Sequence, residues 1–407
     1  MIIYKNADII TMAGNEIIHN GVIAVNGNKI VKVCSNDDFN MAELDGENHV
    51  IVDLSGKTVM PGLINSHMHL TMWRSFGSIT LSKDTATQAF MAARNALNCI
   101  RKGVTSVRDM GHKDDVHMQL KKASEEGVIL APRIKAAIEI IEMSYGHAYH
   151  FCTQVDNSDQ LVKAIRQQIN FGTDFIKIIA SHDDLWHIES EQNTVPWFSQ
   201  EDLNLAVKTA HDVGVKLSAH ANGSECIRRV VNAGFDCIEH GIFMTEDTAK
   251  LMKEKQITLV PTLSGYKENS QSYWNRGENW TKRYGKLWDS HRKSIEYAVK
   301  CGVNIAAGTD TLGTMPEEIT LLHNAGMTKF EALAAATING AVLLDLDDKV
   351  GSLEAGKLAD FIVLSRNPLE DLSALEDITY VVFNGSFYDI KALDNIVPRC
   401  SIYIQGW

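Results

Sequence analysis

The sequence lacks the features that mark membrane, fibrous and disulfide-stapled proteins. It has 407 residues but only 7 prolines, and no segment approaches the roughly 18 uninterrupted apolar residues that a membrane-spanning helix needs. Its 7 cysteines are scattered, odd in number and without a CxxC pair, which argues against a disulfide framework and a thiolate zinc site. We therefore expect an ordered globular protein with ordinary thiols.

Positive charge is also scarce. The formal net charge is -12 and no block of basic residues interrupts it, so phosphate backbones and anionic membrane surfaces would be repelled. The N-terminus has no basic segment followed by a long apolar stretch, as a secretory signal would have. These absences predict a cytoplasmic protein that binds neither nucleic acid nor membrane and acts on small molecules. We further expect a homo-oligomer.

Short β-rich runs separated by turn signals occupy both ends of the chain. The pair Asn26-Gly27 between two such runs is typical of a hairpin, and 351–360 has the composition of a turn before another apolar run. We predict that residues 1–58 and 350–407 pair into one small β-sandwich domain.

The middle of the chain, residues 59–349, alternates apolar β-like runs with longer segments of helical period. Such alternation is typical of a parallel sheet covered by helices. The eight β-like runs are 59–70, 104–110, 133–141, 174–181, 216–221, 237–241, 258–263 and 304–310. Eight strands with helical crossovers favour an α/β fold of the (β/α)₈ or TIM-barrel type, with a doubly wound open sheet as the alternative.

Two histidines, His67 and His69, stand two residues apart at the end of the first predicted barrel strand. Because side chains alternate along a strand, both imidazoles leave one face while Met68 leaves the other. The active sites of such barrels lie at this end of the strands. An isolated His-x-His is more often incidental, but its position here indicates a metal site.

Polar residues end other predicted strands in the same way. His220, His240 and Asp310 each close an apolar run. Lys177 lies inside one, where burial of the charged amine is costly unless a charge partner or a chemical modification compensates it. Each of them alone could be a core polar group with satisfied hydrogen bonds. Their common position at strand ends indicates one metal-binding site instead.

These residues lie within motifs that resemble the amidohydrolase superfamily over nearly the whole chain. The matching segments are 61–69, 103–109, 174–178, 220–223, 238–241, 308–310 and 351–360. Lys177 on the fourth strand resembles the binuclear branch, in which this lysine is carboxylated by carbon dioxide and bridges two divalent metals.

The resemblance implies a role for each residue. One ion, expected to be Zn²⁺, would be bound by His67, His69 and Asp310, a second by His220 and His240, and both by N-carboxylated Lys177. A hydroxide that bridges the ions would attack the amide carbonyl, with Asp310 as general base and then acid toward the leaving amine. Carboxylation also removes the burial problem of Lys177, since the anion is neutralised by metal charge.

Finer motifs at 108–111, 210–214 and 326–332 resemble the prolidase and Xaa-Pro or Xaa-Arg dipeptidase group of metal-dependent carboxypeptidases. This resemblance implies hydrolysis of an amide bond in a dipeptide or an N-acyl amino acid, with His147 and Tyr266 contacting the substrate. The alternatives are hydrolysis or deamination of a cyclic amide or another small C–N substrate, as in imidazolonepropionase, and a non-catalytic assembly protein.

The chain departs from that group after its third and fourth predicted strands. Where relatives often have glycine pairs, it has other residues at 143–146 and 181–184. One hypothesis is that Asp183 and Asp184 face a basic substrate side chain. The aromatic-rich segment 266–288 is either an active-site lid or a helical insertion that packs on the barrel or on another subunit.

Overall fold

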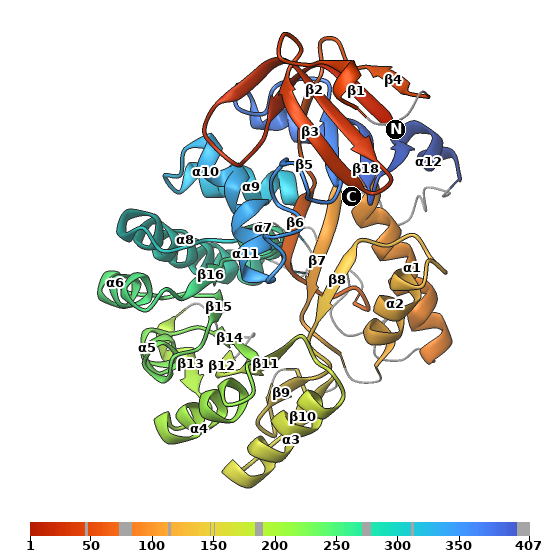
Figure 1. Ribbon diagram of the computed structural model, residues 1–407. Coiled ribbons are helices and arrows are strands. Elements are labelled where there is room, and N and C mark those ends of the chain that lie inside the picture. The colour runs from red at the N-terminus through yellow and green to blue at the C-terminus, as the bar shows by residue number, and fades with distance from the viewer. Residues whose placement is uncertain are drawn as a thin grey trace.

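The structure is a computed structural model of an α/β protein (Figure 1). It describes residues 1–44, 48–72, 84–112, 115–146, 148–149, 151–183, 190–270, 278–310 and 313–396. In Figure 1 the first strands, in red, and the last strands, in blue, lie together at the top, and the strands and helices of the middle of the chain lie below them.

One eight-stranded sheet combines the two ends of the chain. Its strands are β1 (Ile2–Ile10), β2 (Ile17–Asn26), β3 (Lys29–Ser35), β4 (Val50–Asp53), β5 (Thr58–Pro61), β17 (Phe361–Leu364), β18 (Ile378–Phe383) and β19 (Ser386–Asp389). The strand order is β19-β18-β17-β5-β1-β2-β3, with β4 beside β1. β5 runs parallel to β1 and antiparallel to β17, so this strand joins the N-terminal and C-terminal parts. Tyr4, Ile23 and Phe361 belong to the apolar core of this sheet.

Parallel strands form the middle of the chain. One sheet holds β6 (Leu63–Met68), β7 (Val104–Asp109) and β8 (Arg133–Ala136). A second sheet holds β9 (Ile140–Glu142), β10 (Cys152–Gln154), β11 (Phe175–Ile179), β14 (Lys216–Ala221), β15 (Cys237–His240) and β16 (Thr258–Val260), in the order β10-β9-β11-β14-β15-β16. A short antiparallel pair, β12 (Ser181–Asp183) and β13 (Thr194–Pro196), follows β11. We call this pair the β12–β13 hairpin.

Backbone hydrogen bonds connect the two parallel sheets on both sides. On one side the amide of Asp174, just before β11, donates to the carbonyl of Ala136 in β8 over 3.0 Å, and the chain runs on from β8 into β9. On the other side the segment 304–310 accepts from the amides of Leu259 in β16 and Ser66 in β6. Because the strands are parallel, their carboxyl ends lie on one side of the molecule.

Three predicted strands differ in the structure. The run at 59–70 is divided, because β5 pairs with β17 in the other sheet and only β6 continues into the parallel set. The run at 133–141 is split into β8 and β9. The run at 304–310 makes one isolated bridge at Ile305 and ends at Asp310, whose φ of 55° is a left-handed conformation that a strand does not accommodate.

Helices cover the outside of the parallel strands (Figure 1). They are α1 (Thr85–Arg101), α2 (Val116–Glu125), α3 (Ser158–Asn170), α4 (Gln200–His211), α5 (Ser224–Ala233), α6 (Glu246–Glu254), α7 (Leu263–Ser270), α8 (Glu278–Cys301), α9 (Met315–Asn324), α10 (Lys329–Ala335), α11 (Ile338–Leu343) and α12 (Ile390–Ile396). Many begin at a side-chain cap, such as Asp84 before α1, which accepts from the amide of Thr87. Among the described residues, every helix falls short of the length or the apolar character that a membrane span requires.

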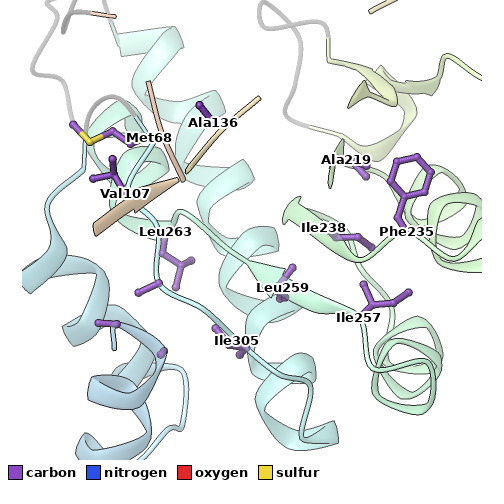
Figure 2. Close-up of a cluster of buried hydrophobic side chains, with 14 of the residues drawn as sticks. Met68, Val107, Ala136, Ala219, Phe235, Ile238, Ile257, Leu259, Leu263 and Ile305 are labelled. Carbon is purple, nitrogen blue, oxygen red and sulfur yellow. The ribbon is translucent and has the colours of Figure 1, made fainter. Parts of the chain in front are cut away.

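Apolar side chains between the parallel strands and the helices form the main core. Met68, Val107, Ile238 and Leu259 come from four different strands and belong to one buried cluster (Figure 2). Met68 lies in this core, as the alternation along its strand predicts. The burial of these side chains fixes the strands, and the strands in turn fix the polar residues at their carboxyl ends.

Candidate metal centre

Three predicted ligands meet where β6 and the segment 304–310 end. One ligand atom from each of His67, His69 and Asp310 lies within 4.8 Å of the others, a spacing that can hold a metal ion. Both histidines are buried, and the Asp310 carboxylate is partly exposed. The amide of Asp310 donates to the carbonyl of His67 over 2.9 Å, which ties the two ends of the group together through the backbone.

The close approach of these two segments depends on Gly308. A Cβ atom at this position would lie 2.7 Å from the Cβ of His67 and 2.8 Å from its backbone nitrogen. No real side chain tolerates such contacts with a backbone atom. Glycine at 308 therefore allows Asp310 to reach the histidines.

The other two histidines continue this group across the neighbouring strands. His220 lies in β14 and His240 ends β15, and their ring centroids are 4.6 Å apart. The ring of His240 lies 5.0 Å from that of His67, which in turn lies 5.6 Å from that of His69. The backbone of His240 has a φ of 67°, a strained conformation of the kind that clusters at functional sites.

Lys177 lies on β11, beside Ser218 of β14. It is 2% exposed, and its Nζ has no hydrogen-bond partner among the described residues. Burial lowers the pKa of this amine to about 8. An orphaned buried amine next to a group of histidines fits a lysine that is converted into a metal ligand, because carboxylation and metal coordination would satisfy its polar atoms.

A buried ion pair that the sequence did not reveal supports His67. Glu239 of β15 is fully buried and lies 2.6 Å from His67 Nδ1 through Oε2 and 2.8 Å from Arg108 Nη1 through Oε1. The hydroxyl of Ser218 also donates to Oε1. Burial would raise the pKa of Glu239, but Arg108, His67 and Lys177 outweigh burial and hold it well below its usual range. A carboxylate only accepts, so His67 Nδ1 carries the proton and Nε2 keeps a lone pair for a metal.

A second buried carboxylate contacts His220. Asp183, in the β12–β13 hairpin, is 1% exposed, and its Oδ2 lies 2.7 Å from His220 Nε2 and accepts from Asn222 Nδ2 over 2.6 Å. In the structure Asp183 thus contacts a predicted ligand, and the hypothesis that it faces a basic substrate side chain stays a prediction. Asp184 lies outside the described residues.

Of the two predicted substrate-binding residues, Tyr266 lies next to the group. Its ring in α7 is 5.3 Å from that of His240 and 5.1 Å from that of His291 in α8. His291 Nε2 donates to the carbonyl of His240 over 3.0 Å, so α8 also supports this strand end. His147 lies outside the described residues, as does 271–277 of the aromatic-rich segment.

The first turn of α7, which precedes Tyr266, is held by a third buried carboxylate. Glu318 of α9 accepts from the amides of Leu263 at 3.0 Å and Ser264 at 2.6 Å, as an acidic group at a helix N-terminus does. Glu318 is fully buried. Burial raises its pKa to about 7, and the bonds from Ser264 and Leu263 oppose the rise.

The chain is similar to proteins of one family. Residues 58–387 match the amidohydrolase family. Ochratoxinase of Aspergillus niger is 28% identical over 370 residues, which cover 81% of this chain and 75% of that protein. A solved Xaa-Pro dipeptidase with methionine bound in its active site aligns with a TM-score of 0.84 and 29% identity, over 95% of this chain and 99% of the other. A prolidase in complex with N-methylphosphonate-L-proline aligns over the same shares with a TM-score of 0.85 and 25% identity.

The chain therefore belongs to the amidohydrolase family, and its resemblance to the prolidase-like group is confirmed. It is an enzyme that acts on C–N bonds rather than a non-catalytic assembly protein. This family is metal-dependent, and the group of His67, His69 and Asp310 could bind a metal ion.

Proposed function

We propose that this amidohydrolase is a binuclear metal-dependent hydrolase that cleaves an amide bond of a dipeptide or an N-acyl amino acid. The observation that carries the proposal is Lys177, a buried amine without a hydrogen-bond partner among the described residues. We also propose the architecture that the sequence predicts. It consists of a (β/α)₈ barrel at 59–349 and a small β-sandwich domain formed by 1–58 and 350–407. The hydrogen bonds that link the two parallel sheets on both sides support a closed ring.

In this proposal each side of the centre holds one ion. The ligands would be His67, His69 and Asp310 for the first ion, His220 and His240 for the second, and N-carboxylated Lys177 for both. Two divalent ions, expected to be Zn²⁺, would supply Lewis acidity toward the carbonyl and an activated water at neutral pH. The pair His220 and His240, whose ring centroids lie 4.6 Å apart, would supply the protein ligands of the second ion.

The residues of the chain then move the proton. Asp310 is the one carboxylate among the six ligands and its side chain is 25% exposed, so it can reach both the centre and the substrate. We propose that it takes the proton of the attacking water and returns it to the leaving amine. Tyr266, whose ring contacts His240, would orient the substrate, and His147 would contact its carbonyl or carboxylate.

The names of the similar proteins support this substrate class. Two of them are a Xaa-Pro dipeptidase and a prolidase, and the second was solved with a phosphonate analogue that contains proline. Dipeptides and N-acyl amino acids share one reaction. Attack on the amide carbonyl releases an amino acid, whose amine is the leaving group and which also has a carboxylate. Two expectations stay predictions: that the protein binds neither nucleic acid nor membrane, and that it forms a homo-oligomer.

The test combines metal counting with a substrate panel. Protein loaded with Zn²⁺ in the presence of bicarbonate should contain two ions per chain and release amino acids from a dipeptide and N-acyl amino acid library. Lys177→Ala should reduce kcat/KM by at least about 100-fold, because both ions lose a ligand. Lys135→Ala is the control. Lys135 lies on β8, forms an ion pair with Asp174 at 3.2 Å and is not one of the proposed ligands.

Three outcomes would overturn the proposal. A fully loaded enzyme that cleaves none of the library contradicts the substrate class. One ion per chain, together with full activity of Lys177→Ala, contradicts the binuclear centre. Release of ammonia from amino-purines or ring opening of cyclic amides would favour the deaminase or cyclic-amide alternative.

A further inference from the structure

The β12–β13 hairpin brings a carboxylate, that of Asp183, into contact with His220. Asp183 is the last residue of β12, and its register partner in β13 is Thr194. Its Oδ1 accepts from Ser181 Oγ over 3.2 Å, while Oδ2 meets His220 Nε2 and Asn222 Nδ2. The side chain is thus held from its own strand and from the end of β14.

Asn222 makes this contact part of a larger network. Its backbone amide donates to Ser181 Oγ over 3.0 Å, and its Oδ1 accepts from the amide of Ile242 over 2.9 Å. Ile242 follows His240 by two residues. The network therefore joins the hairpin to the strand ends that carry both histidines of the proposed second ion.

The chemistry of imidazole decides what this contact does. A neutral histidine has one N–H and one nitrogen lone pair, and a carboxylate can only accept, so the nitrogen that faces Asp183 carries the proton. His220 then has its proton on Nε2 and its lone pair on Nδ1. His67 has the opposite arrangement, because its Nδ1 faces Glu239.

We propose that Asp183 is a positioning residue that fixes the Nε2–H tautomer of His220 and so presents Nδ1 to a divalent cation. The inference rests on the proposed metal centre and goes beyond it, since it assigns the support of the second ion to the β12–β13 hairpin. Carboxylate–histidine–metal arrangements of this kind typically change metal affinity by about 10–100-fold when the carboxylate is removed.

The main experiment measures metal affinity rather than turnover. Metal-free wild type and Asp183→Asn are titrated with buffered free Zn²⁺, and bound zinc per chain is counted. We expect two bound ions in the wild type and, in the variant, a dissociation constant about 10–100-fold weaker for one of them. The matched control is Asp236→Asn, because Asp236 makes a similar contact with His211 at 2.9 Å, far from the ligands at the opposite end of β14. Both dissociation constants should be unchanged in this control.

A second measurement does not depend on the variant being folded. The ¹⁵N shifts of histidine in zinc-loaded wild type, assigned with His220→Gln, should report the Nε2–H tautomer for His220. The Nδ1–H tautomer, or equal zinc affinities in wild type and Asp183→Asn, would overturn the inference. If the wild type binds only one ion, the binuclear proposal fails separately. The affinity of Asp183→Asn for that ion then decides the inference, where a 10–100-fold loss supports it and no loss overturns it.

Discussion

Two histidines of the centre are held by buried carboxylates that come from different kinds of structure. Glu239, which contacts His67, lies in a parallel strand and shares its charge with Arg108 of another strand. Asp183, which contacts His220, lies on a short hairpin beside the parallel sheets. In the proposed binuclear centre, the support of the first ion is therefore built into the core, whereas the support of the second ion comes from an added hairpin. Changes in the two halves should therefore have unequal costs.

The largest effect is expected in the half built into the core. Glu239→Gln leaves the Arg108 guanidinium buried without its anion, and removing one member of a buried ion pair costs about 3–5 kcal/mol. Urea unfolding of the metal-free protein should show a loss of this size. Glu225→Gln, which breaks exposed pairs with Arg228 and Arg229, should change stability by less than about 1 kcal/mol. Equal losses in the two variants would contradict the role of the buried pair.

Glu318 sharpens the comparison because it is a buried carboxylate whose pKa moves in the other direction, to about 7. The folded state then keeps a proton that the unfolded state loses near pH 4.5, so this contribution to stability is present at low pH and is lost as the pH rises through 7. At about 1.4 kcal/mol per pKa unit, the stability of wild type relative to Glu318→Gln should fall by about 2–3 kcal/mol between pH 5 and pH 8. Urea unfolding at both pH values measures it. A pH-independent difference would show that Glu318 titrates normally.

Two glycines allow the His67 side and the His220 side of the centre to be compared by adding a methyl group to each. Gly308→Ala forces a methyl group against the backbone of His67, and overpacking of this kind costs about 1–3 kcal/mol. Gly223→Ala meets the Thr194 side chain of the hairpin at a φ of 83°, which costs about 1–2 kcal/mol for a residue other than glycine. Zinc titration should show weaker binding of the ion on the His67 side in Gly308→Ala. In Gly223→Ala the ion on the His220 side should bind more weakly. If both variants lost affinity for the same ion, the distinction between the His67 side and the His220 side of the centre would be contradicted. Gly356→Ala, at a φ of 95° with open space around it, is the control for backbone strain alone.

The smallest effect concerns an anchor of the hairpin at the surface. Glu191 accepts from the amide of Ser224, the first residue of α5, over 2.7 Å. Glu191→Gln should lower the protection of that amide against hydrogen exchange by about 0.5–1 kcal/mol, because a charge at a helix N-terminus is lost. Amides in the middle of α5 serve as the internal reference. Unchanged protection at Ser224 would show that the hairpin does not depend on this contact.

Periodicity made much of the molecule predictable. His67 and His69 have the spacing that puts both on one face of a strand, and Lys177, His220 and His240 lie in apolar runs that the structure confirms as β11, β14 and β15. These features are local, so the sequence around each residue contains the necessary information.

Contacts between distant segments were not predictable in the same way. Glu239 and Arg108 are charged residues inside apolar strands, but nothing local shows that the two face each other across 131 residues. The contact of Asp183 with His220 likewise joins a hairpin residue to a strand 37 residues further along the chain. The segment 304–310 also forms a single bridge at Ile305 instead of the predicted strand, and it is held beside β6 by bonds such as that from the amide of Asp310 to the carbonyl of His67.

One of these long-range contacts has a consequence for how the enzyme is made. Asn65 Nδ2 donates to Thr309 Oγ1 over 2.7 Å, although 244 residues separate them in the chain. At a synthesis rate of roughly 5–20 residues per second, a nascent chain presents His67 roughly 12–50 s before Asp310 leaves the ribosome. During that interval the two histidines are exposed ligands without their carboxylate. The proposed site of the first ion would therefore be complete only late in synthesis, and chains truncated before 304 would lack its carboxylate.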